Sequence, residues 1–264
     1  MTIDFHTHAF PDMLAQKAIG VLTSNLTIDL KPVHNGTVSD LIARMDEWGI
    51  DKSVVAPIVT KPSQTKTLNE WAVSITSQRI ISLGSIYPST DNYKQDIDFV
   101  CSLGLKGLKF HAEYQNFILD APEMLRIYDY ALSRGLIILH HAGADYGMPA
   151  PYKSSPKQFA NVADQMCGGI IVAAHLGGHA QWDDVFDNLC GKNIYLDTSM
   201  GFEYYGKEMF KKIVSKHGAD KILFASDSPW SNAGDDLKAL RDCGLDCDTI
   251  SMIEAKNAQR ILKI

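Results

Sequence analysis

The sequence lacks the features that mark several broad classes of protein. Its 264 residues contain no apolar run near the roughly 18 residues that a membrane-spanning helix needs. The first residues carry neither a basic stretch nor a long apolar stretch, so we expect no secretory signal peptide. These absences predict a cytoplasmic protein without a membrane partner.

Cysteine is scarce, odd in number and not arranged in close pairs. The chain has five cysteines and no Cys-x-x-Cys motif. Such a set fits reduced thiols in the cytosol better than a disulfide framework or a zinc knuckle. The cysteines are Cys101, Cys167, Cys190, Cys243 and Cys247.

Neither sign of charge is in large excess. Twenty-five lysines and arginines against 31 acidic residues give a formal net charge of −6, which offers no electrostatic footprint for nucleic acid. An apolar content of 45% with 21% charged residues is ordinary for a globular protein and excludes a disordered, collagen-like or coiled-coil chain. Neither Gly-x-Gly-x-x-Gly after a strand nor a P-loop motif occurs, which disfavours the nucleotide-binding folds.

Short apolar runs alternate with helical patterns along the chain. Most of the runs are continuously apolar, as in strands that are buried on both faces of a parallel sheet. Eight strand–helix repeats in about 250 residues predict a single-domain α/β protein, a (β/α)8 TIM barrel over residues 1–264. A doubly wound open sheet is the structural alternative. The predicted strands are 2–8, 52–59, 80–87, 106–111, 136–141, 170–175, 193–199 and 222–227.

The helical patterns occupy most of the remaining sequence. The clearest is 37–48, whose apolar residues fall on one face and which Gly49 follows as a stop. Two long connections, 9–36 and 142–156, follow the first and fifth strands, and we expect them over the C-terminal face of the barrel. The other predicted helices are 66–78, 92–102, 121–134, 157–167, 180–190, 206–217 and 249–262.

Side chains that can bind a metal gather at the ends of the predicted strands. His6 and His8 are two residues apart, so both can face the barrel axis. The carboxyl ends of barrel strands meet at one mouth, and imidazole and carboxylate groups suit a divalent ion such as Zn2+. The sequence therefore predicts a metal site. Its candidates are His6, His8, Lys109, His111, His140, His141, His175 and Asp227.

Each candidate also has a structural alternative. His175 alone fits a hydrogen-bonded core or surface histidine, and Asp227 alone fits the N-cap of a turn. Lys109 alone fits a surface lysine whose stem covers apolar surface. Because His140 and His141 are adjacent, we expect one to face inward and the other to pack against helices. The convergence favours a metal, since burying so many ionisable groups together is costly unless they are paired or coordinated.

Several other polar residues have less specific interpretations. His217 ends a predicted helix, where a cation would complement the helix dipole. His34 fits a solvent-exposed position in a loop or a part of a lid. His179 fits either a residue that contacts the metal ligands from behind or a surface residue. Asp197 and Ser199 end the seventh strand, where they could orient a ligand imidazole or cap a helix.

Six segments in order along the chain carry a recognisable set of motifs. They are IDFHTH at 3–8, GLKFH at 107–111, LHHAG at 139–143, AHLGG at 174–178, ASDSP at 225–229 and KNAQRIL at 256–262. Together they resemble the amidohydrolase-related family. This branch of the amidohydrolase superfamily includes aminocarboxymuconate-semialdehyde decarboxylase and γ-resorcylate decarboxylase.

The resemblance implies a (β/α)8 barrel with one divalent metal ion, usually Zn2+, with Mn2+ or a second metal as alternatives. It implies the ligands His6, His8, His141 and Asp227 and places His175 against a metal-bound water. Other branches of the superfamily use a carbamylated lysine to bridge two metals, so Lys109 keeps a two-metal site open.

These observations lead to two enzyme hypotheses and one of another class. The first is a metal-dependent hydrolase of a small, carboxylated amide, lactone or ester. Asp227 and His175 would accept or relay the proton of a metal-activated water. Lys109 and His111 would hold the substrate carboxylate. The second is a non-oxidative decarboxylase of an aromatic or unsaturated acid. The third is a barrel that only binds or signals. A homodimer is compatible with the sequence.

Overall fold

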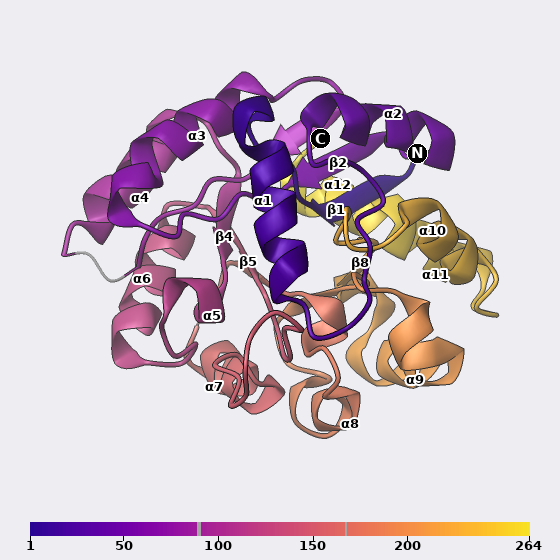
Figure 1. Ribbon diagram of the computed structural model, residues 1–264. Coiled ribbons are helices and arrows are strands. Elements are labelled where there is room, and N and C mark those ends of the chain that lie inside the picture. The colour runs from indigo at the N-terminus through magenta and orange to yellow at the C-terminus, as the bar shows by residue number, and fades with distance from the viewer. Residues whose placement is uncertain (89–90, 167) are drawn as a thin grey trace.

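The computed structural model describes residues 1–88, 91–166 and 168–264. In this part of the chain, parallel strands form an inner ring and helices surround it (Figure 1). Neighbouring strands run in the orders β1-β2-β3 and β4-β5-β6-β7-β8. The strands are β1 Ile3–Thr7, β2 Lys52–Val55, β3 Ile80–Ser82, β4 Gly107–Phe110, β5 Ile137–His140, β6 Ile170–Ala173, β7 Tyr195–Asp197 and β8 Ile222–Leu223.

Single bridges join these two groups of strands into a closed ring. Gly84 pairs with Leu108 between β3 and β4, and Thr7 pairs with Ser228 between β1 and the segment after β8. At the second junction the N–H of His8 donates to the carbonyl of Ser228 at 2.6 Å. Closure confirms the predicted TIM barrel and shows that the open-sheet alternative is wrong.

The helices confirm most of the predicted pattern. α2 begins at the N-cap Thr37, whose side chain accepts from the N–H of Asp40, and it ends at Gly49 with a φ of 71°. The helices are α1 Asp12–Asn25, α2 Val38–Trp48, α3 Thr65–Ser74, α4 Tyr93–Ser102, α5 Ala112–Gln115, α6 Pro122–Ser133, α7 Pro156–Gln165, α8 Trp182–Asp184, α9 Phe202–His217, α10 Ala233–Arg241, α11 Cys247–Ser251 and α12 Asn257–Leu262. π-helical turns at Val185–Leu189 and Met252–Lys256 extend α8 and link α11 to α12.

Three of the described helices, α1, α5 and α10, were not predicted from the sequence. α1 falls within the connection 9–36, and it escaped prediction because only Ala15 among its residues is buried. α5 and α10 follow the fourth and eighth strands, and Asn232 caps α10 by accepting from the N–H groups of Gly234 and Asp235. The predicted helix 157–167 ends on Cys167, which lies outside the described residues. The expectation that Cys167 is a reduced thiol concerns the same residue.

The core explains why the strands read as continuously apolar. Ile3, Phe5 and Leu139 fill the inside of the barrel, while other strand residues such as Val55 and Ile138 pack outward against the helices. Each such buried side chain contributes roughly 1.5–3 kcal/mol. The barrel is therefore a rigid frame that fixes where each strand ends.

Two expectations from composition can be compared with this frame. None of the described helices has the length and apolar content needed to cross a bilayer. The four described cysteines form no disulfide: Cys101, Cys190, Cys243 and Cys247.

Candidate metal centre and active site

A pocket at the carboxyl ends of the strands is lined by seven of the eight candidates that the sequence analysis names, all but His140. It encloses a cavity of about 200 Å³. Its walls include Leu22 and Leu26 from segment 9–36 and Tyr146 from the connection 142–156, so both long connections shape the mouth. The predicted residues in its lining are His6, His8, Lys109, His111, His141, His175 and Asp227.

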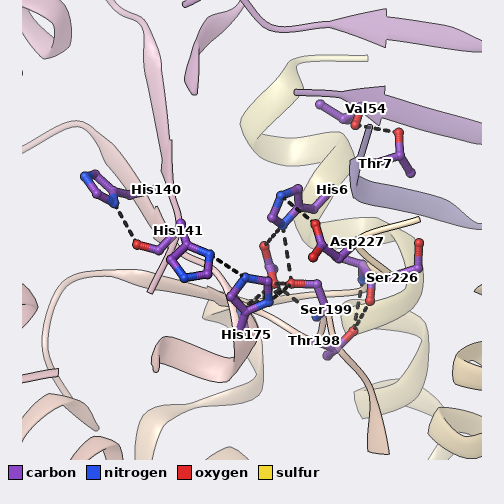
Figure 2. A network of polar contacts seen from close by, with 12 residues as sticks. His6, Thr7, Val54, His140, His141, His175, Thr198, Ser199, Ser226 and Asp227 are labelled. Atoms are coloured by element: carbon purple, nitrogen blue, oxygen red, sulfur yellow. Dashed lines mark hydrogen bonds and ion pairs between the residues drawn. The ribbon is translucent and has the colours of Figure 1, made fainter. Parts of the chain in front are cut away.

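Three of the predicted metal ligands lie together at the floor of this pocket. Nε2 of His6 lies 3.2 Å from Nε2 of His8. Oδ1 of Asp227 lies 3.2 Å from Nε2 of His6 and 3.0 Å from Nε2 of His8. Figure 2 shows how closely His6 and Asp227 approach each other. Two imidazole nitrogens and one carboxylate oxygen at this spacing form a donor set that suits a divalent ion.

The protonation of His6 is the one that a metal ligand needs. Oδ2 of Asp197 lies 3.1 Å from Nδ1 of His6, and because a carboxylate only accepts, Nδ1 carries the hydrogen. Burial lowers the pKa of His6 well below its usual value, so the ring is neutral. Nε2 therefore keeps a lone pair, which accepts from Nζ of Lys109 at 2.7 Å. Asp197 thus orients the imidazole of His6.

An uncommon backbone conformation directs Asp227 toward the two histidines. Its φ of 67° is left-handed, which costs a residue with a side chain about 1 kcal/mol or more. Its N–H donates to the carbonyl of His6 at 2.8 Å. Burial alone would raise the pKa of Asp227, but His6 and His8 hold that pKa below its usual value, so the group is ionised. The N-cap expected nearby is Asn232 instead.

Asp4 ties the first strand to the segment that carries Asp227. Its Oδ2 accepts from Oγ of Ser226 at 2.6 Å, and its Oδ1 accepts from the N–H of Ser226 at 3.0 Å. Oγ of Ser226 in turn accepts from the N–H of Ser228 at 3.0 Å. Burial raises the pKa of Asp4 to about 7. These contacts fix the strand end beside the metal-type ligands.

His175 lies between two polar partners at the end of β6. Its Nδ1 lies 2.9 Å from Oγ of Ser199, and its Nε2 lies 3.0 Å from Nδ1 of His141 (Figure 2). Its backbone N–H donates to Oδ1 of Asp197 at 3.0 Å, so one carboxylate positions both His175 and His6. Burial lowers the pKa of His175 to about 3, which leaves the ring neutral.

His141 also takes part in a second group of metal-type side chains. It joins His111 and Asp145, with donor atoms within 4.8 Å of one another. Nε2 of His111 lies 3.0 Å from Oδ2 of Asp145, and its ring stacks on His141 at 4.1 Å. Nδ1 of His111 lies 3.4 Å from Oε2 of Glu113. His111, which the sequence assigns to a substrate carboxylate, thus already faces two protein carboxylates.

Lys109 also has its partner within the protein. The residue is 1% exposed, and its ammonium group donates to His6 rather than extending into open space. Burial lowers the pKa of Lys109 to about 8. It is not the surface lysine that its type alone would suggest.

His179 is the functional candidate that sequence reasoning placed least well. It lines the pocket and is 2% exposed, so its interpretation as a surface residue is wrong. Neither of its ring nitrogens has a hydrogen-bond partner among the described residues. The rings of Tyr146, Trp182 and Tyr204 surround it edge-on, at 4.9, 5.3 and 5.1 Å. Burial lowers its pKa to about 4.

The remaining histidines have structural roles. His140 packs among aromatic rings such as Phe159 and faces away from the pocket, as predicted for one of the two neighbours. His34 is 5% exposed, so an exposed position is excluded. His217 is a correction: burial lowers its pKa to about 4, so it is neutral and not a cation at a helix end. Its Nε2 donates to the carbonyl of Ile194 at 2.9 Å.

Comparisons with known proteins agree with this fold. A family model described as amidohydrolase matches residues 3–264. The search of curated proteins found no match. Among solved structures, a 5-carboxyvanillate decarboxylase from Sphingomonas paucimobilis shares 16% identity, with a TM-score of 0.74 over 100% of this chain and 99% of that one.

Two further solved structures show the range of named activities on this architecture. A probable 2-pyrone-4,6-dicarboxylic acid hydrolase from Acinetobacter baumannii has 17% identity and a TM-score of 0.68, over 100% of this chain and 99% of the other. A dihydroxybenzoic acid decarboxylase from Polaromonas, which holds manganese, has 17% identity and a TM-score of 0.69, over 99% and 96%.

Proposed function

Because this chain belongs to the amidohydrolase family, we propose that it is a metal-dependent hydrolase that cleaves an ester, lactone or amide of a small molecule. The observation that carries the proposal is the group formed by His6, His8 and Asp227, with Asp197 fixing the His6 tautomer. When bound, a divalent ion polarises a carbonyl group and lowers the pKa of water toward neutrality.

The residues present fit such an ion. His6 is neutral with a lone pair on Nε2, and Asp227 is ionised, which are the states that ligation requires. We propose His6, His8 and Asp227 as ligands and His141 as the fourth. Nε2 of His141 is buried and has no hydrogen-bond partner in the described part of the chain. Mainly imidazole donors favour Zn2+, with Mn2+ as the alternative.

Asp227 and His175 are the proposed proton carriers. Asp227 is an ionised carboxylate at the pocket floor and can accept a proton from water. His175 is neutral and held from both sides by Ser199 and His141, so its ring is oriented before substrate arrives. Apolar side chains such as Leu26 and Trp230 line the same pocket.

Decarboxylation is the second candidate, because two of the similar structures carry that activity in their names. The proposed metal ion would itself supply the cation that a substrate carboxylate needs, so the group formed by His6, His8 and Asp227 serves either reaction. The substrate panel below separates the two.

Metal analysis followed by a substrate panel tests the proposal. We expect about one ion per chain in the purified protein by mass spectrometry of the elements. His8→Ala and Asp227→Asn should lose it, while the exposed-site control Ser24→Ala should retain it. Full metal content in both ligand variants would refute the site. Release of CO2 from carboxylated aromatics, without hydrolysis of any ester, lactone or amide, would replace hydrolase by decarboxylase.

A further inference from the structure

The ammonium group of Lys109 holds the atom of His6 that a metal ligand uses. Nζ of Lys109 lies 2.7 Å from Nε2 of His6. Because Nδ1 of the same ring donates to Asp197, Nε2 carries no hydrogen and accepts from the lysine. Lys109 is buried, so bulk water does not solvate its charge. Lys109 and a divalent ion therefore compete for one lone pair.

This competition has a consequence for Lys109. Nε2 of His6 has a single lone pair, so Lys109 must leave that atom when His6 ligates an ion. The ammonium group would then stay buried without its partner and beside a like charge, which is unfavourable on both counts. Lys109 therefore needs an anionic partner once the metal site is filled.

Three carboxylates at or beside the pocket are the internal candidates for this partner. Both oxygens of Asp197 already accept hydrogen bonds. Oδ1 of Asp145 accepts from the N–H of Gly147 at 2.7 Å, and its Oδ2 lies 3.0 Å from Nε2 of His111. Asp227 is the proposed ligand carboxylate, so its second oxygen is the internal alternative to an anion from outside.

The pocket gives such an anion room, because Lys109 is part of its lining. Its cavity of about 200 Å³ is smaller than the roughly 300–1,000 Å³ of sites for drug-sized ligands. Its wall is mixed: leucines such as Leu26 lie beside the polar side chains of Thr60, Tyr114 and Tyr146. A wall of this kind and a cavity of this size fit one small ring or short chain that carries one charged end.

We propose that Lys109 leaves His6 when an ion binds there and then pairs with the carboxylate of a small monocarboxylate substrate. The ion and the carboxylate thereby strengthen each other's binding, because the carboxylate neutralises the ammonium group that the ion has displaced, and such coupling is reciprocal. This inference rests on the proposed function for its metal site, and it names the class of substrate and the order in which the site fills.

Zinc affinity with and without a carboxylate measures this coupling without turnover. Metal-stripped protein is titrated with zinc against a chromophoric chelator, alone or with millimolar benzoate or its uncharged counterpart benzamide. We expect benzoate to tighten zinc binding about tenfold, within the roughly 5- to 150-fold range of such couplings, and benzamide to leave it unchanged. Wild-type protein whose zinc affinity is the same with benzoate and with benzamide overturns the inference.

Lys109→Met distinguishes pairing with the lysine from direct ligation of benzoate by the ion. Without benzoate, this variant should bind zinc about tenfold more tightly than wild type, because the competitor for His6 is gone. Benzoate should then no longer tighten the binding. Lys106→Met is the matched control, since it removes the same charge from an exposed lysine three residues earlier, and it should behave as wild type.

The variants give two results that contradict the inference. An undiminished benzoate effect in Lys109→Met would mean that the carboxylate binds without the lysine, and weaker zinc binding by that variant would mean that the lysine supports the ion. If Lys109→Met does not fold, the wild-type comparison of benzoate with benzamide still decides. The expected coupling in a protein that hydrolyses nothing counts against the proposed reaction only, and zinc binding without coupling counts against this inference only.

Discussion

Replacing Asp197 by asparagine should weaken metal binding by about 10- to 100-fold while the fold persists. Oδ1 of Asp197 accepts from the backbone N–H groups of His175 and Ser199, both at 3.0 Å, and from the Ser199 hydroxyl. Oδ2 accepts from Nδ1 of His6 at 3.1 Å. An asparagine has only one side-chain oxygen. We expect that oxygen to take the place of Oδ1, because three donors point at that position.

The amide nitrogen of the variant therefore faces His6 and donates to it. Nδ1 of His6 must then accept, so its hydrogen moves to Nε2, the atom that lies beside His8, Lys109 and Asp227. An imidazole with a hydrogen on Nε2 cannot ligate through that atom. The expected loss corresponds to about 1.4–2.8 kcal/mol of binding free energy.

Competition between the protein and a metal chelator measures this loss directly. Ser199→Ala is the matched control, because it removes a hydroxyl from Asp197, His175 and Nδ1 of His6 but leaves the contact between Asp197 and His6. We expect the control to bind metal nearly as well as wild-type protein. If the Asp197→Asn protein is folded and keeps wild-type affinity while His8→Ala loses it, the tautomer argument is refuted.

Three further predictions concern charge. Lys109→Met should keep one ion per chain, because Lys109 is not among the proposed ligands; a drop from two ions to one in elemental analysis would instead identify a bridging lysine. Asp236, whose pKa burial raises to about 7, holds its proton between pH 4 and 7 only when folded, so stability falls as pH rises through that window. Asp236→Asn should be stabler than wild type by roughly 2–4 kcal/mol at pH 8 and similar at pH 4 in urea unfolding. His217, whose pKa burial lowers to about 4, stabilises the fold above pH 6.5 and loses up to about 3 kcal/mol as pH falls to 4; His217→Gln should flatten that slope, and an unchanged slope would contradict the assignment.

The barrel was predictable because its strands obey local rules. Segments such as Ile137–His140 are buried on both faces, so they read as continuous apolar runs whatever their neighbours are. Closure then places the last residues of distant strands at one mouth, which is why His6 and Asp227 could be paired from 221 positions apart in the sequence. α1 had no such signal, because it buries only Ala15 and lies over the pocket rather than in the core.

The grouping of side chains within the mouth was not readable from the sequence. Strand position says that His141 faces inward, but not that its Nδ1 meets His175 or that Asp145 returns from the following connection to face His111. Those contacts depend on the path of a loop, and a loop path is set by packing between segments far apart in the chain.

The position of His179 in the pocket wall could not be read from the sequence either. Four residues after His175, it could lie anywhere from the surface to the core, and only its pairing with the backbone of Ala142 and Ala144 brings it to the pocket wall. That pairing needs Gly143, since any side chain there would meet the His179 backbone. We expect Gly143→Ala to separate the two connections and to slow hydrolysis of the ester, lactone or amide that the substrate panel identifies, while the metal content stays at the wild-type level. A variant that loses metal as well would mean that this loop supports the ligand group and not the substrate wall alone.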